Sequence, residues 1–215
     1  MRWLRKSQAV PLTALKTPAE LTERDESPTV HDSPALTEIF GNLDTDRPVR
    51  VLDLGPALQT NLDFYTKIAN GVRIVPLQRN DGLEGLQQLD AEAFAARLDR
   101  LLPIGDDAFG LVLMWDLLNY LNDEQPSLLA HHLAAVAERG ASIYVMIFTA
   151  GTMPREPSRY ELLAGGRLAY RPTTRRRTAA PDPPPAKVER WIKPFRVERS
   201  FLLRHGVREF IAVNA

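Results

Sequence analysis

The stretch VRVLDLGPALQTNLDFYTKIANGVRIVPL, residues 49–77, decides the fold of this chain. It opens with a short apolar run that ends at Gly55, which predicts a buried strand followed by a tight turn. Residues 62–70 then carry apolar side chains at helical spacing, and Gly71 ends that pattern. A second short apolar run at 72–77 predicts another buried strand. The order of strand, helix and strand indicates a unit with parallel strands.

The same alternation continues downstream. It predicts a helix at 90–102, a strand that opens the segment 109–121, a helix at 127–140 and a strand at 141–149. Asp90 and Ser127 stand where a helix N-cap is expected. The strands are apolar on both faces, which is typical of a sheet covered by helices on both sides. We therefore expect an α/β fold with a mainly parallel sheet.

The C-terminal segment FRVERSFLLRHGVREFIAVN, residues 195–214, follows a different pattern. It holds two strand-like runs separated only by Arg204, His205 and Gly206. Strands joined by so short a connection run antiparallel. We therefore expect the sheet to finish with a C-terminal antiparallel hairpin.

Two segments lie outside the strand and helix pattern. Residues 1–33 contain scattered apolar residues and three prolines, so we expect a flexible N-terminal arm before a single domain at 34–215. Ser33 and Pro34 then provide an N-cap and a first helical residue for a short helix. Residues 171–187 hold five prolines and no large apolar side chain, so we expect a flexible basic loop there.

The formal net charge of zero conceals a separation of charge along the chain. Residues 40–140 hold 15 acidic and 8 basic residues, a balance of −7. Residues 171–215 hold 11 basic and 4 acidic residues, a balance of +7. Either the two parts attract each other within one domain, or the basic part binds an anionic partner.

Composition excludes several classes of protein. The chain has no cysteine, so it holds neither a disulfide framework nor a thiolate metal site. No apolar run approaches the ~20 residues of a membrane-spanning helix. The N-terminal residues lack the continuous apolar stretch of a secretory signal, and the cytoplasm is the expected compartment. The histidine spacing does not suit a metal site, and we expect none.

Three stretches resemble the class I S-adenosylmethionine-dependent methyltransferase family. VRVLDLGPALQTN at 49–61 is similar to the family's first strand and cofactor loop. LPIGDDAFGLVLMWDLLNYL at 102–121 is similar to the family's fourth strand and its flanks, and 191–214 to its last two strands. The resemblance implies a Rossmann-like sheet, S-adenosylmethionine as cofactor, and methyl transfer to an unidentified acceptor.

The resemblance also implies a set of cofactor-binding and substrate-binding positions. Those for the cofactor are Asp53, Gly55, Ala57, Gln59, Asn61, Gln78, Asp107 and Asp116. Those for the substrate are Trp115, Asn119 and Tyr120. No catalytic residue follows from the resemblance, because much of the rate of methyl transfer comes from positioning and desolvation.

The cofactor loop departs from the family's Asp/Glu-x-Gly-x-Gly-x-Gly pattern. Ala57 and Gln59 replace the second and third glycines, and Pro56 removes a backbone donor. Gln78 stands where the family usually has an acidic residue for the ribose hydroxyls. A neutral amide gives weaker hydrogen bonds than a carboxylate, so we expect a weak cofactor site.

Several of these residues have an alternative interpretation. Asp53 could simply bond backbone amides of its own turn, and Asp116 could cap the next short helix. Asp106 and Asp107 could form a solvated turn instead of contacting adenine, and Trp115 could pack in the core instead of stacking on a ligand.

Two other functions remain open. A non-catalytic binding or scaffold protein would keep the fold and explain the altered cofactor loop. Alternatively, Arg175, Arg176 and Arg177 could bind nucleic acid, although no aromatic residues are interleaved with them for base stacking.

Overall fold

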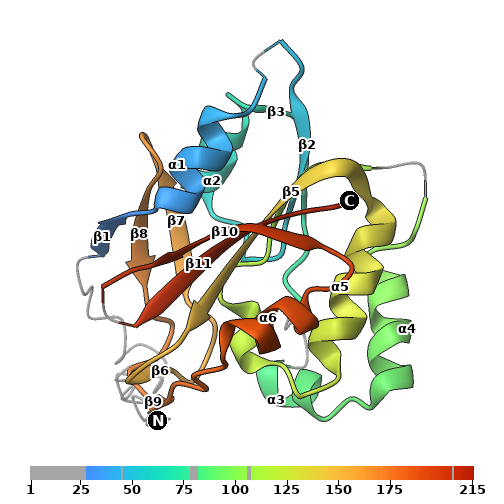
Figure 1. Ribbon diagram of the computed structural model, residues 1–215, viewed down its shortest axis with the longest axis vertical. Helices are drawn as coiled ribbons and strands as arrows, with labels where there is room; N and C mark the ends of the chain where they lie inside the picture. The colour runs from blue at the N-terminus through green and yellow to red at the C-terminus, as the bar shows by residue number, and fades with distance from the viewer. Residues whose placement is uncertain (1–27, 45, 78–81, 106–107, 205) are drawn as a thin grey trace, which may run out of the picture.

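The computed structural model describes residues 28–44, 46–77, 82–105, 108–204 and 206–215. Its largest sheet has six strands in the order β10-β11-β5-β4-β2-β3 (Figure 1). The pairs β2·β3, β2·β4 and β4·β5 are parallel, whereas β11 runs antiparallel to both β5 and β10. The predicted α/β fold, its mainly parallel sheet and its C-terminal hairpin are confirmed. The strands are β2 (Val49–Asp53), β3 (Ala69–Ile74), β4 (Phe109–Leu113), β5 (Ala137–Phe148), β10 (Arg196–Leu202) and β11 (Val207–Val213).

Helices cover both faces of this sheet, because neighbouring residues of a strand point to opposite sides. In β2, Leu52 joins a core with α4, α5 and α6, whereas Val51 joins a second core with α1 and α2. Figure 1 shows α3 to α6 gathered on one side of the sheet and α1 on the other. The helices are α1 (Pro34–Gly41), α2 (Gln59–Tyr65), α3 (Gly82–Gln87), α4 (Ala91–Leu101), α5 (Gln125–Val136), α6 (Pro185–Trp191) and the 3₁₀ turn η2 (Leu117–Tyr120).

Two of the three predicted helix caps are confirmed. The side chain of Ser33 accepts from the amide of Leu36 at 3.1 Å, and that of Asp90 accepts from the amide of Ala93 at 2.8 Å. Ser127 is not a cap, because α5 begins two residues earlier. The helix tolerates Pro126 in its first turn, where the missing amide has no intrahelical partner to lose.

An insertion between β5 and α6 forms two further antiparallel sheets that the sequence pattern did not predict. Its strands β7 (Arg159–Leu163) and β8 (Arg167–Arg171) form a hairpin, turning at Gly165 and Gly166, both with positive φ. Strands β6 (Thr152–Pro154) and β9 (Arg177–Ala179) form a second, two-stranded sheet.

The segment expected to be a flexible arm ends in regular structure. Residues 1–27 lie outside the described part of the chain, but β1 (Thr29–Asp32) pairs with β8 and makes it the middle strand of three. The hairpin with β7 leaves one edge of β8 unpaired, and β1 pairs with that edge. A sequence pattern alone does not reveal such a pairing.

The segment 171–187 also differs from the predicted loop. It contains the end of β8, all of β9 and the start of α6. Most of its residues are nevertheless exposed, and Pro183 is buried. Its flexibility stays a prediction.

Candidate functional site

Asp53 forms the centre of the site at the carboxyl end of β2. Its side chain is fully buried and accepts hydrogen bonds from the amide of Gly55 at 2.8 Å and the hydroxyl of Tyr65 at 2.6 Å. The indole Nε1 of Trp115 donates a third bond, also at 2.6 Å. Burial raises the pKa of Asp53, and these hydrogen bonds oppose that rise.

Trp115 follows β4 and reaches across to β2. Its backbone has φ of 52°, a left-handed conformation that is strained for a large side chain. Its ring stacks on Tyr160 of β7, with centroids 5.4 Å apart and planes 7° from parallel. A Cβ on Gly55 would lie 2.8 Å from the indole Nε1, so glycine is needed at that position for the ring to fit.

Asp116, the next residue, is also buried. Its Oδ2 accepts from the Tyr160 hydroxyl at 2.9 Å, the Ser158 amide at 3.2 Å and, more weakly, the Tyr120 hydroxyl at 3.4 Å. Burial raises the pKa of Asp116 to about 7, although the hydrogen bonds from Ser158 and Tyr160 lower it. The side chain does not cap η2, as the alternative interpretation proposed.

These side chains fill the crevice between the ends of β2 and β4. The remaining cavity, bordered by Gly55, Trp115 and Ser158, encloses about 10 Å³, which is room for one water molecule. The hydroxyl of Ser158 faces no hydrogen-bond partner among the described residues. A larger hollow of about 410 Å³, at residues 193–197, contains none of the predicted site residues.

The other predicted positions have varied surroundings. Asn61 is buried. Its side-chain amide donates a hydrogen bond to the carbonyl of Tyr160 and accepts one from the amide of Leu162, so it holds β7 against α2. Asn119 donates to the carbonyl of Asp116 and accepts from the amide of Phe148, which fixes the loop after β4.

Ala57 and Gln59 are exposed, and the Gln59 amide donates to Asp63 within α2. Gln78, Asp106 and Asp107 lie outside the described residues. The structure therefore brings together Asp53, Gly55, Trp115, Asp116 and Tyr120, and leaves Ala57 and Gln59 at the surface.

Sequence reasoning missed Tyr65, Ser158 and Tyr160. Tyr65 was assigned only to a helix, because nothing local shows that its hydroxyl reaches a strand end. The segment that contains Tyr160 could have been predicted from the sequence. Residues 159–171 contain alternating apolar residues around a Gly-Gly pair, which is typical of a hairpin.

Within the described ranges, no group of three or more histidine, aspartate or glutamate side chains is arranged to hold a metal ion. No helix among the same residues is long and apolar enough to cross a membrane.

Comparisons with known proteins identify the fold. No family model matches the chain, and no curated protein matches it. The solved structure of the PH0226 protein from Pyrococcus horikoshii is 12% identical with a TM-score of 0.50, and the match covers 83% of this chain and 87% of the other. At this identity the likeness shows the fold alone.

Two further matches carry descriptive titles. The N-methyltransferase NodS from Bradyrhizobium japonicum, solved with S-adenosylhomocysteine, is 9% identical with a TM-score of 0.48, covering 83% of this chain and 85% of the other. DesVI from Streptomyces venezuelae is 16% identical with a TM-score of 0.47, covering 84% and 91%. The expected Rossmann-like α/β fold is confirmed.

The described conformation does not admit S-adenosylmethionine at the ends of β2 and β4. A pocket for a ligand of that size has a volume of about 300 Å³ or more. Here Trp115 lies against Gly55, and Tyr160 covers the indole ring. Side chains of the protein fill the space between the ends of these two strands.

Proposed function

We propose that this chain is an S-adenosylmethionine-dependent methyltransferase whose cofactor crevice is closed in the described conformation by Trp115. The cofactor binds weakly at the carboxyl ends of β2 and β4 after the indole ring leaves Gly55. The methyl acceptor is not identified by the residues present.

The observation that carries this proposal is a pair of buried carboxylates at the crevice. Among the described residues, the groups that donate to Asp53 and Asp116 are all neutral: backbone amides, tyrosine hydroxyls and an indole. A buried carboxylate without a cation is costly, and burial raises the pKa of both. S-adenosylmethionine carries an ammonium and a sulfonium group, so it would supply the missing positive charge.

Opening the crevice costs several kcal/mol. It breaks the hydrogen bond from Trp115 to Asp53, worth ~1.5–3 kcal/mol when the acceptor is charged, and a ring stack worth ~0.5–1.5 kcal/mol. Release of the strained backbone at Trp115 returns ~1–3 kcal/mol. These terms differ by on the order of 1–2 kcal/mol, and exposing the buried indole adds about 1.5–3 kcal/mol, so opening weakens the cofactor's apparent affinity.

The non-catalytic alternative stays a second proposal. If the conformation with a cavity of about 10 Å³ is permanent, the fold serves as a non-catalytic binding or scaffold protein. The two functions differ in one measurable property, which is affinity for the cofactor.

Calorimetric titration with S-adenosylmethionine and with its demethylated product tests the proposal. We expect both to bind with micromolar or poorer affinity, and we expect Gly55→Trp to abolish binding because the new ring would fill the cavity. Gly41→Trp is the matched control, since nothing lies within 4 Å of a Cβ at Gly41. Absence of heat at millimolar cofactor would reject the enzyme and leave the scaffold function.

A further inference from the structure

Two antiparallel segments of the insertion bring six arginines together. The backbone of Pro154 pairs with that of Arg177, and the amide of Arg155 donates to the carbonyl of Arg176 at 3.0 Å. Further along, Arg159 lies directly opposite Arg171 in the ladder between β7 and β8. We call this feature the arginine ribbon; it comprises Arg155, Arg159, Arg171, Arg175, Arg176 and Arg177.

The ribbon places like charges opposite each other across two strands. Such pairs destabilise a sheet, and here they occur twice, at Arg155 with Arg176 and at Arg159 with Arg171. Glu161 pairs with Arg171 at 3.0 Å. The Arg177 side chain donates to the hydroxyl of Thr152 at 2.7 Å, which leaves its charge uncompensated by any acid the structure records beside it.

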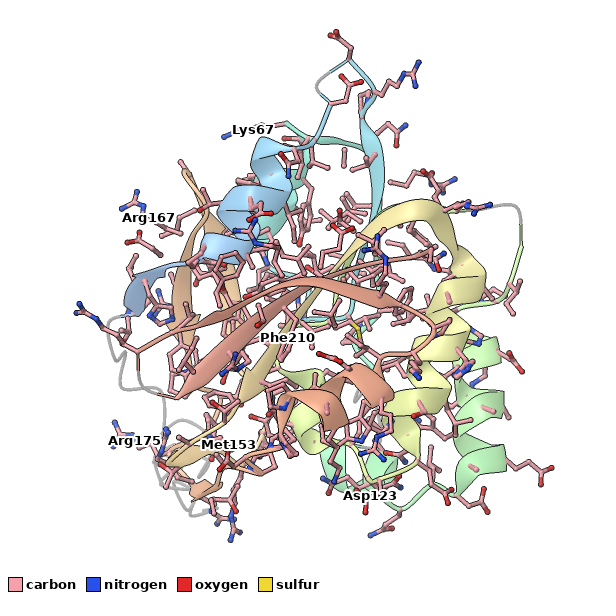
Figure 2. The ribbon with its side chains drawn as sticks, viewed as in Figure 1. Lys67, Asp123, Met153, Arg167, Arg175 and Phe210 are labelled. Atoms are coloured by element: carbon pink, nitrogen blue, oxygen red, sulfur yellow. The ribbon has the colours of Figure 1, made fainter. Side chains whose placement is uncertain are left out.

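The side chains of the ribbon lie at the surface. All six are exposed except Arg171, which is half-buried. Figure 2 shows Arg175 pointing outward at the margin of the molecule. The acids nearest in sequence are Glu156, Glu161 and Asp182, so positive charge exceeds negative charge along these segments.

The choice of cation indicates the chemistry of the partner. Residues 149–186 contain seven arginines and no lysine. The planar guanidinium binds phosphate through two parallel hydrogen bonds, which the point charge of lysine cannot do. Among the described residues beside the ribbon, Tyr160 is buried and Tyr170 is half-buried, so neither offers a fully exposed ring for stacking on unpaired bases.

We propose that the arginine ribbon binds the phosphate backbone of duplex nucleic acid without reading its sequence. A duplex has the densest regular array of phosphates and requires no base stacking. This inference does not depend on methyl transfer.

A bound duplex would lie beside the crevice. The backbone carbonyls of Pro154 and Glu156 accept from the hydroxyl of Tyr120, and the amide of Ser158 donates to Asp116. Residues 154–158 are therefore hydrogen-bonded to Asp116 and Tyr120, which lie in the segment after β4.

The test is fluorescence anisotropy of the full chain with a labelled DNA duplex of about 20 base pairs, at salt concentrations between about 50 and 200 mM. Each phosphate neutralised contributes about −0.9 to the slope of log affinity against log salt, so we expect a slope between about −3 and −5. Arg155→Gln with Arg176→Gln should reduce the steepness by about 2 and weaken binding at least tenfold at low salt.

Arg100→Gln with Arg139→Gln is the matched control, because both side chains are exposed and lie on α4 and β5. The control should bind as the wild type does. If thermal unfolding shows that the first variant is misfolded, Arg159→Gln with Arg175→Gln replaces it with the same expected result.

Three results would overturn the inference. They are no binding of the duplex at the lowest salt, equal loss in the ribbon and control variants, and displacement of the duplex by polyglutamate at equal charge. The last result would assign the ribbon to an acidic protein.

Discussion

Asp116 is the residue whose ionisation the fold opposes most clearly. Its pKa is raised to about 7 in the folded protein, whereas an aspartate in the unfolded chain titrates near its ordinary value of 3.8. Between these two values the folded state holds a proton that the unfolded state has lost. Stability from this group is therefore full below pH ~4 and is lost as the pH rises toward 7.

Asp116→Asn should remove this pH dependence, because the amide resembles the protonated acid and keeps an oxygen for Tyr160 and Ser158. We expect the variant to equal the wild type near pH 4 and to be more stable by roughly 2–4 kcal/mol near pH 8. Urea unfolding at several pH values measures the difference.

Asp46→Asn, at an exposed acid, is the control and should give a constant difference. A variant that is less stable than the wild type at pH 8 would show that the carboxylate is favourable in the crevice as a charge.

Gly55 and Trp115 should show strong energetic coupling. Gly55→Ala places a methyl group 2.8 Å from the indole Nε1, and we expect a loss of about 1–3 kcal/mol of unfolding free energy from overpacking. In a Trp115→Ala background the same change should have a clearly smaller effect, since the ring is absent and only the contact with Asp53 Oδ1 at 3.0 Å remains. A double-mutant cycle measured by chemical denaturation gives the coupling; additive losses would mean that the ring does not occupy this position.

At the residue scale, the sequence predicted which residues lie close together at the candidate site but not how they interact. Asp53, Gly55, Trp115 and Asp116 were assigned to the ends of two parallel strands, and such ends meet at one edge of a sheet. Trp115 donates a hydrogen bond to Asp53 instead of facing a ligand. This arrangement depends on the positive φ of Trp115, which a sequence pattern does not predict.

Among the elements, α1 is joined to the sheet by a buried polar cluster. Glu209 of β11 accepts from the hydroxyl of Ser33 at 2.5 Å and from the hydroxyl of Tyr144 at 2.7 Å. Ser33 also caps α1 through the amide of Leu36. Burial raises the pKa of Glu209, and the hydrogen bonds from Ser33 and Tyr144 oppose that rise.

Ser33→Ala should therefore destabilise the protein by about 2–4 kcal/mol, from the lost cap and from a buried carboxylate that loses a donor. Chemical denaturation measures the loss, with Ser200→Ala on the exposed part of β10 as control. A loss below about 1 kcal/mol would mean that only the cap matters, because that is its usual contribution.

The segment 172–182 should contribute little to folding, although β9 lies within it. Most of its residues are exposed, so a Gly/Ser linker removes little buried apolar surface. We expect a change of about 1 kcal/mol or less in unfolding free energy, together with loss of duplex binding. A loss of several kcal/mol would show that the β6·β9 pair supports the domain.

The elements that sequence predicted poorly share a physical cause. The repeated strand and helix units between 49 and 149 are long and apolar, and their periods are clear. Strands β1, β6 and β9 have only three or four residues each, and β1 and β9 have mostly exposed side chains, so backbone pairing with distant segments defines them. Pairing of that kind leaves no period in the sequence.

At the scale of the whole molecule, the fold was predictable because burial on two faces of one sheet requires apolar strands and amphipathic helices in alternation. The insertion after β5 was not predictable as a cover for the crevice. Tyr160 meets Trp115 only because Asn61 holds β7 against α2, and that contact joins residues about a hundred positions apart.

The central claim is that Trp115 closes a cofactor crevice that the fold still provides. The most direct test is calorimetric titration of the wild type and of Trp115→Ala with S-adenosylmethionine. If opening costs on the order of 3–5 kcal/mol, removal of the ring should tighten binding by about a hundredfold or more, from a wild-type affinity in the micromolar range or poorer. Failure of both proteins to bind at millimolar cofactor, or tight wild-type binding that Trp115→Ala weakens, would contradict the claim.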